Sequence, residues 1–260
     1  MRTDEVGCSS SPSTAEDACL PDGDSPSGRT DDGPPWPLII AGPSGVGKGT
    51  LIERLMHSPY GPHIRKCVSH TTRKARPGEA HGREYFFVDK DQFMADVGRG
   101  VFLEHAEVHG NLYGTSIEAV GRVQREGKIC LMEIDVQGVR QLKALPLGSR
   151  AHTVFVEPPD LVALEKRLRG RGTEEEEKVR TRLNNATGEM CRAHELGFDL
   201  FLVNDDFNRS YGELVATLAQ WYPSVVRRHT SASGHEYDER KQLTVKDACK
   251  GRERSLSSGH

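Results

Sequence analysis

A glycine-rich segment near the start of the chain contains the residue types that hold phosphate groups. It follows the short apolar run Leu38–Ala41 and reads Gly42-Pro43-Ser44-Gly45-Val46-Gly47-Lys48-Gly49-Thr50. The glycines let successive backbone N–H groups turn around phosphate oxygens, and the start of a following helix adds partial positive charge. Lys48 is a compact cation that can reach the outer phosphates. The order of strand, loop, lysine and helix therefore predicts a P-loop.

The position after the lysine departs from the usual P-loop pattern. A Ser or Thr there commonly holds Mg²⁺, whereas this chain has Gly49 and places the hydroxyl one residue later, at Thr50. We therefore expect magnesium near Thr50, held more through water. The loop does not indicate which phosphate chemistry follows, because many unrelated activities share it.

A second group of anion-binding side chains comes later in the chain. Residues 69–79 read S-H-T-T-R-K-A-R-P-G-E, so Arg73 and Arg76 lie three positions apart. Two arginines at this spacing can converge on one anion, and each can hold two of its oxygens. Tyr85 and Tyr113 offer neutral donors to the same anion. The segment predicts a second phosphate site.

Together these segments resemble the guanylate kinases, a family of P-loop nucleoside monophosphate kinases, over about residues 37–228. The matching motifs, in family order, are Gly-Pro-Ser-Gly in the P-loop, Ser-x-Thr-Thr-Arg-x-x-Arg-x-Gly-Glu from residue 69, Gly-Asn-x-Tyr-Gly from residue 110, Ile134-Asp135-Val136-Gln137-Gly138, Arg167-Leu168-x-x-Arg171-Gly172-Thr173 and Val203-Asn204-Asp205-Asp206. The resemblance implies in-line transfer of phosphate from ATP to GMP, and to dGMP, with Mg²⁺ present.

The resemblance also implies roles for individual residues. The phosphate of GMP would be bound by Arg73, Arg76, Tyr85 and Tyr113. The guanine would be read by Ser69, Glu104 and Thr115, with Asp135 beside that pocket. The same substrate site would include Glu79, Gln137 and Gly138. Besides the P-loop, the ATP site would include Arg167, Asn204 near the adenine, and Asp205. The catalytic cations would be Lys48, Arg76, Arg171 and Arg182, the last two from a mobile lid.

One strand departs from the family pattern as well. The strand before Gln137 often carries Asp-x-Asp, whereas here it carries Glu133-Ile134-Asp135. Glutamate keeps the charge and reaches one carbon further. Glu133 or Asp135 would meet magnesium through water, or Glu133 would instead meet an arginine.

The chemistry of guanine supports the assignment of Glu104 independently. Guanine presents N1–H and its N2 amino group as adjacent donors, and one carboxylate can accept both. Adenine has an acceptor at N1, which would face that carboxylate with a lone pair. The acceptor in the implied reaction is a phosphate oxygen that is already anionic, so no general base is needed. Catalysis would come from positioning and from cations around the transferring group.

Two alternatives are weighed against this interpretation. The first is a kinase of related fold that acts on AMP or on a phosphorylated sugar, which the Ser69, Glu104 and Thr115 set disfavours. The second is a guanylate-kinase-like module that binds phosphopeptides without catalysis. Such modules typically lack P-loop or lid residues, whereas this chain keeps Lys48, Arg171 and Arg182.

The elements that must position these residues alternate along the chain. The apolar runs that predict strands span 38–41, 129–134, 153–156 and 200–203. Helical spacing follows them at 48–57, 136–145, 160–169 and 211–221. This alternation predicts an α/β three-layer fold with a parallel central sheet. Short strands at 85–88 and 102–104 predict a strand-rich GMP-binding insertion over about 67–127, and a charged helical lid is expected over about 167–190, opening at Thr173 with a capping box to Glu176.

Both ends of the chain differ in composition from this region. Residues 1–36 are acidic and rich in Ser, Pro and Gly, and residues 230–260 are charged and poor in aliphatic side chains. Such segments cannot bury enough apolar surface to offset their ordering entropy, so we expect disordered tails around a domain at 37–229.

The whole-chain composition excludes several classes of protein. The six cysteines of the 260 residues are widely spread with no C-x-x-C pair, which argues against a disulfide framework or a structural zinc site. A net charge of −3 does not indicate the basic surface that general nucleic-acid binding needs. No apolar run is long enough to span a membrane. We expect a cytoplasmic monomer whose partners are GMP and ATP.

Overall fold

The computed structural model describes residues 33–170 and 176–225. The predicted tails therefore lie almost wholly outside the described residues, and so do Arg171 and Thr173.

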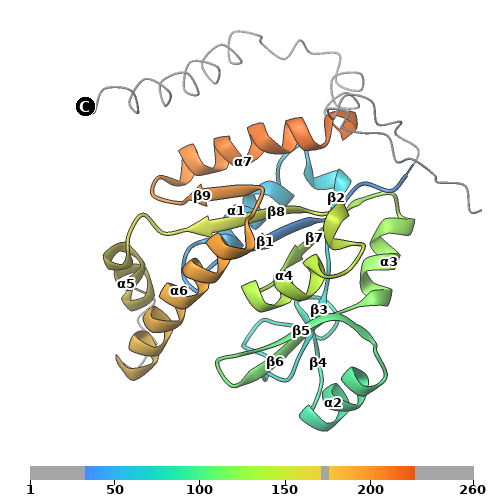
Figure 1. The fold of residues 1–260 in the computed structure, drawn as a ribbon, viewed down its shortest axis with the longest axis horizontal. Coiled ribbons are helices and arrows are strands. Elements are labelled where there is room, and N and C mark those ends of the chain that lie inside the picture. Colours follow the sequence, from blue (N-terminus) through green and yellow to red (C-terminus); the bar gives the residue numbers. More distant parts are fainter. Residues whose placement is uncertain (1–32, 171–175, 226–260) are drawn as a thin grey trace, which may run out of the picture. The chain divides into compact units, whose positions relative to one another are not determined.

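A five-stranded parallel sheet forms the centre of the described region (Figure 1), in the order β2-β7-β1-β8-β9. Its strands are β1 (Leu38–Ala41), β2 (Ile64–Lys66), β7 (Ile129–Glu133), β8 (His152–Glu157) and β9 (Leu200–Val203). Leu38 lies in register with Leu131 of β7 and with His152 of β8. The predicted parallel sheet and α/β fold class are confirmed.

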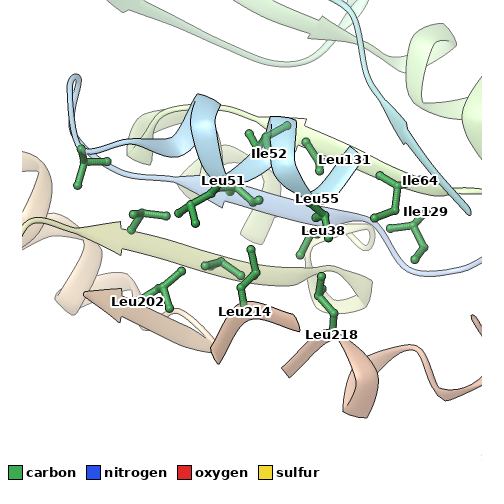
Figure 2. Close-up of a cluster of buried hydrophobic side chains, with 14 of the residues drawn as sticks. Leu38, Leu51, Ile52, Leu55, Ile64, Ile129, Leu131, Leu202, Leu214 and Leu218 are labelled. Atoms are coloured by element: carbon green, nitrogen blue, oxygen red, sulfur yellow. The ribbon is translucent and has the colours of Figure 1, made fainter. Parts of the chain in front are cut away.

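Helices cover both faces of this sheet. Successive residues of a strand point to opposite sides, and the residues of β1 are apolar on both sides, so both faces need to be buried. Their bounds are α1 (Lys48–Met56), α3 (Ile117–Arg125), α4 (Val136–Lys143), α5 (Leu161–Arg169), α6 (Glu176–Leu196) and α7 (Phe207–Trp221), with 3₁₀ turns η1 (Gly61–His63) and η2 (Gly148–Arg150). On one face Leu38 and Ile40 pack with α1 and α7, through residues such as Leu51, Leu55, Leu214 and Leu218 (Figure 2).

The other face of β1 builds a second core. Ile39 and Ala41 pack there with buried residues of α3 and α4, which include Val120, Val123 and Leu142. Both cores contain residues that are essentially inaccessible to solvent. The central strand, and with it the start of the P-loop, is therefore held from both sides.

A smaller mixed sheet lies between α1 and β7 in the sequence, in the order β4-β3-β6-β5. Its strands are β3 (Ser69–Thr71), β4 (Tyr85–Phe87), β5 (Phe102–Val108) and β6 (Asn111–Ser116), and α2 (Lys90–Gly98) accompanies it. Phe93 of α2 stacks on Phe102 with ring centroids 4.5 Å apart. The ladder between β5 and β6 shifts register between Phe102 and Glu104.

Several elements were not predicted, and α7 begins earlier than expected. β2, α2 and α3 were not predicted from the sequence. The helix expected from 211 begins at Phe207, because the side chain of Asp206 accepts a hydrogen bond from the Arg209 amide at 2.9 Å. This N-cap satisfies a donor that would otherwise lack a partner at the helix start.

We predict that Gly42→Ala lowers the free energy of unfolding by more than about 2 kcal/mol. Gly42 has φ 144°, and a Cβ there would overlap the backbone carbonyl of Val156 in β8. Thermal and denaturant unfolding would measure the change.

The control is Gly49→Ala in the same loop and helix start. Gly49 is helical, and a Cβ there would meet nothing within 4 Å. Alanine should leave stability unchanged or raise it by up to about 1 kcal/mol. Equal losses in both variants would contradict the backbone overlap as the cause.

Candidate active site

The P-loop connects the carboxyl end of β1 to α1. The Val46 amide donates to the Pro43 carbonyl at 3.3 Å and closes the turn. Lys48 Nζ donates to the Gly42 carbonyl at 2.5 Å and to the Pro43 carbonyl at 3.1 Å. The lysine side chain thus lies along its own loop, where an incoming phosphate oxygen would find an ammonium group already in place.

Two neighbouring elements hold the P-loop by hydrogen bonds. Arg167, near the end of α5, donates to the carbonyls of Val46 (3.1 Å) and Asn204 (2.7 Å). The buried Asn204 side chain donates to the same Val46 carbonyl at 2.8 Å. The sequence grouped Arg167 with a mobile lid, but the structure places its guanidinium against backbone carbonyls. Asp205 is exposed and pairs with Arg209.

Arg182 on α6 also reaches the P-loop. Its Nη1 donates to Ser44 Oγ at 3.3 Å, across 138 positions of sequence. Arg169, which the sequence gave no role, instead pairs with two carboxylates, Glu165 and Glu176. Of the predicted catalytic cations, the structure therefore brings Lys48 and Arg182 to one loop, while Arg171 lies outside the described residues.

The second predicted phosphate site is a cavity of about 400 Å³. Its lining consists of Lys66, Arg73, Arg76, Glu79, Arg83, Glu84, Tyr85 and Tyr113. Four cations against two carboxylates leave a formal charge of +2 on this lining. The cavity therefore has the charge and the donors to hold a dianion such as a phosphate monoester.

Local contacts hold Arg73 at this cavity. Both Glu79 carboxylate oxygens accept from Arg73 Nη2 at 2.9 Å, and one also accepts from the Arg76 amide at 2.8 Å. The Arg73 guanidinium lies 5.5 Å from the centre of the Tyr85 ring. Burial raises the pKa of Tyr85 to about 12, so its hydroxyl remains a donor at neutral pH.

The residues predicted to read a base lie together in the smaller sheet. Ser69 Oγ and Thr115 Oγ1 are 3.0 Å apart, across β3 and β6. Glu104 on β5 lies opposite Thr115 in the ladder and is 3% exposed. Burial, together with the nearby Asp135 carboxylate, raises the pKa of Glu104 to about 7, although hydrogen bonds from Thr115 lower it.

The start of α4 packs against this group. Asp135 caps the helix, because its carboxylate accepts from the Gly138 amide at 2.8 Å and from the exposed Gln137 side chain at 3.1 Å. A Cβ on Gly138 would overlap the Glu104 carboxylate. Glycine at this position therefore lets the helix approach the buried acid closely.

The candidate magnesium residues do not form a closed cage. Thr50 is exposed on the first turn of α1, and Glu133 lies close enough to Lys66 and Lys48 that these lysines outweigh its burial and lower its pKa. Within the described part of the chain, no three His, Cys, Asp or Glu side chains gather in a way that could hold a metal. Mg²⁺ keeps several waters and is usually bound by one or two protein groups plus phosphates, so these residues fit a magnesium ion that arrives on a nucleotide.

Two cations of the cavity, Lys66 and Arg83, were not predicted from the sequence. Arg83 lies within the predicted insertion over about residues 67–127 but was given no role, and Lys66 precedes the motif that begins at Ser69. Lys66 reaches the cavity because β2 pairs with β7, and no local sequence pattern indicates that long-range contact.

Among the described residues, no helix is long and apolar enough to cross a membrane. The three described cysteines, Cys67, Cys130 and Cys191, are free thiols.

Comparison with known proteins identifies relatives across most of this region. Residues 35–221 match the model of the family described as guanylate kinase. The guanylate kinase of Homo sapiens is 45% identical over 187 residues, covering 72% of this chain and 93% of the human one. That of Escherichia coli (strain K12) is 43% identical over 177 residues, covering 68% and 83%.

Two further relatives differ in how much of their length is matched. Guanylate kinase 1 of Oryza sativa subsp. japonica is 48% identical over 184 residues, 70% of this chain, which spans about half (47%) of the rice protein. The crystal structure of guanylate kinase from Anaplasma phagocytophilum is similar with a TM-score of 0.57 and 27% identity, covering 77% of this chain and 96% of that one.

We predict that Glu104→Gln raises thermal stability at pH 8 and that this gain shrinks toward pH 5. The unfolded carboxyl has a pKa near 4.5 and the folded one near 7. Between these values the folded state binds more protons, so the wild type loses stability as pH rises through this window. The difference between variants should reach up to about 3 kcal/mol above pH 7.

Glu118→Gln on α3 is the matched control, because Glu118 is exposed and paired with Arg125. It should show no comparable gain. An equal loss of stability in Glu104→Gln at both pH values would contradict the cost assigned to the buried carboxylate.

Proposed function

The chain belongs to the guanylate kinase family, and we propose that it transfers the terminal phosphate of ATP to GMP, forming ADP and GDP. The observation that carries the choice of acceptor is the buried carboxylate of Glu104 beside the hydroxyls of Ser69 and Thr115. A carboxylate can accept from both N1–H and the N2 amino group of guanine, whereas adenine would bring an acceptor to the same place.

The cationic cavity supports the other half of this proposal. Arg73, Arg76 and the tyrosines Tyr85 and Tyr113 line a space with a formal +2 charge, which matches the charge of a nucleoside monophosphate. Arginine forks hold two oxygens each, and tyrosine hydroxyls add neutral donors. We assign Glu79 to orienting Arg73, because its two oxygens hold that guanidinium.

The donor nucleotide is assigned to the P-loop. Backbone N–H groups of the loop from Ser44 to Thr50 would surround the β-phosphate region, and Lys48 would stabilise charge on the transferring group. Arg167 and Asn204 support the loop from behind through the Val46 carbonyl. The attacking phosphate oxygen is anionic at neutral pH, so alignment and cations suffice and no side chain must remove a proton.

Magnesium would accompany ATP and supply positive charge to its phosphates. We assign Thr50 to hold it, with Glu133 and Asp135 contributing through water. We also assign dGMP as an acceptor, because the described contacts predicted for the base and the phosphate do not involve the sugar. Arg182, which already reaches Ser44, would bind the donor phosphates from α6.

A phosphopeptide-binding module is the alternative function. It would share the cavity of arginines and tyrosines but would not need Lys48 or Arg182 at the P-loop. The contact between Arg182 and Ser44 favours the enzyme.

We expect the protein to phosphorylate GMP with ATP and to use AMP, CMP and UMP at least about 1000-fold less well in kcat/KM. A site built to accept the donors of one base leaves its own buried groups unpaired with another. A coupled assay of ADP formation with each monophosphate would measure this. Comparable rates on AMP would refute the guanine assignment, and no transfer to any acceptor would favour the binding module.

We also expect Arg182→Ala to reduce kcat by about 100-fold or more, with the affinity for GMP nearly unchanged. Its guanidinium contacts Ser44 of the P-loop, and Arg182 is not among the residues that line the acceptor cavity. Steady-state kinetics combined with calorimetric binding of GMP would separate the two effects.

Arg169→Ala on α5 is the matched control, since Arg169 is held by Glu165 and Glu176. It should keep most of the turnover. Loss of GMP affinity at constant kcat in Arg182→Ala would place Arg182 in the acceptor site instead.

A further inference from the structure

Lys66 is a cation of the acceptor cavity that belongs to none of the motifs found in the sequence. It is the last residue of β2, the edge strand of the main sheet. It lines the cavity with Arg73, Arg76, Tyr85 and Tyr113. The cavity therefore receives one cation from the main sheet in addition to those of the smaller sheet and its loops.

The position of Lys66 follows from strand register. Lys66 pairs with Leu131 of β7, and Glu133 comes two residues later on the same face of that strand. Lys66 Nζ lies 2.8 Å from Glu133 Oε2, and the two side chains are 45% and 25% exposed. The carboxylate thus holds the ammonium group at the cavity wall while leaving part of it open to the cavity.

The charges of the cavity show which cations lack a carboxylate of their own there. Glu79 pairs with Arg73 and Glu84 pairs with Arg83. Among the lining residues this leaves Arg76 and Lys66 as cations that no lining carboxylate neutralises in an ion pair. Lys66 takes its partner from β7, outside the lining.

Glu133 is close enough to interact electrostatically with residues of both predicted phosphate sites. Its charge acts on Lys48 of the P-loop and on Tyr85 of the cavity, as well as on Lys66. An ammonium group has three donors, so Lys66 can keep Glu133 and still donate to a phosphate oxygen. The ion pair with Glu133 therefore orients the Lys66 ammonium group and leaves it donors for a phosphate oxygen.

We propose that Lys66 is a binding residue for the acceptor phosphate and that Glu133 positions it. This inference rests on the proposed function, because it takes the cavity as the site of the GMP phosphate. It adds a lysine to the arginines and tyrosines, and it gives Glu133 a task on the acceptor side. The glutamate reaches one carbon further than the aspartate common at this place in the family, which suits a partner on the neighbouring strand.

The test compares the binding of GMP with that of guanosine, which lacks the phosphate, by calorimetry without ATP or magnesium. Lys66→Met should weaken GMP binding by about tenfold, as expected for loss of a charge-assisted hydrogen bond, and leave guanosine binding unchanged. Lys66→Arg should keep most of the GMP affinity. Unchanged guanosine binding also shows that the variant is folded.

Two further variants control the comparison. Arg65→Met removes a cation from the adjacent residue, which pairs with Glu126 and lies on the other side of the strand, and should leave both affinities unchanged. Glu133→Gln should weaken GMP binding less than Lys66→Met, and the double variant no more than Lys66→Met alone.

Wild-type affinity for GMP in Lys66→Met, or an equal loss for GMP and guanosine, would overturn the role of Lys66 while leaving the proposed function standing. Failure of the wild type to bind or phosphorylate GMP would overturn the proposed function and the Lys66 assignment with it.

Discussion

Repulsion between like charges is the constraint on which the site depends. The protein gathers cations around two proposed phosphate positions and must hold them there before any phosphate arrives. It does so by giving them local acceptors: Glu79 for Arg73, backbone carbonyls for Lys48 and Arg167, and Glu133 for Lys66. Each acceptor fixes a direction as well as a charge. These cations are therefore arranged for anions at limited electrostatic cost.

The proposed base pocket contains a buried anion in place of paired cations. Glu104 is a carboxylate held away from water, opposite Thr115 and near a second carboxylate, Asp135. A buried acid without a cation is unfavourable unless donors are supplied. Thr115 already donates to Glu104, and the donors of a guanine would add to these hydrogen bonds, so the cost of burying this carboxylate favours a ligand that brings donors. The buried carboxylate and the paired cations are thus both suited to the proposed acceptor.

The fold and the P-loop could be predicted from sequence because their signals are contiguous. An apolar run, a glycine-rich turn and a helical pattern stand side by side between residues 38 and 56. The residues that were missed depend on contacts far apart in the chain. β2 has three residues, of which Ile64 alone is buried, so it carries too little pattern to recognise. Lys66 joins the cavity through the pairing of β2 with β7, whose residue Leu131 is about 65 positions away in sequence.

The central place of β1 has a consequence for how the protein is made. Leu38 leaves the ribosome before its partners Leu131 and His152, which are 93 and 114 positions further along the chain. At about 5–20 residues per second, synthesis of those partners takes roughly 5–20 s. During that interval the apolar strand and the phosphate loop have neither neighbour to pair with. The predicted P-loop is thus translated well before both strands that pair with β1.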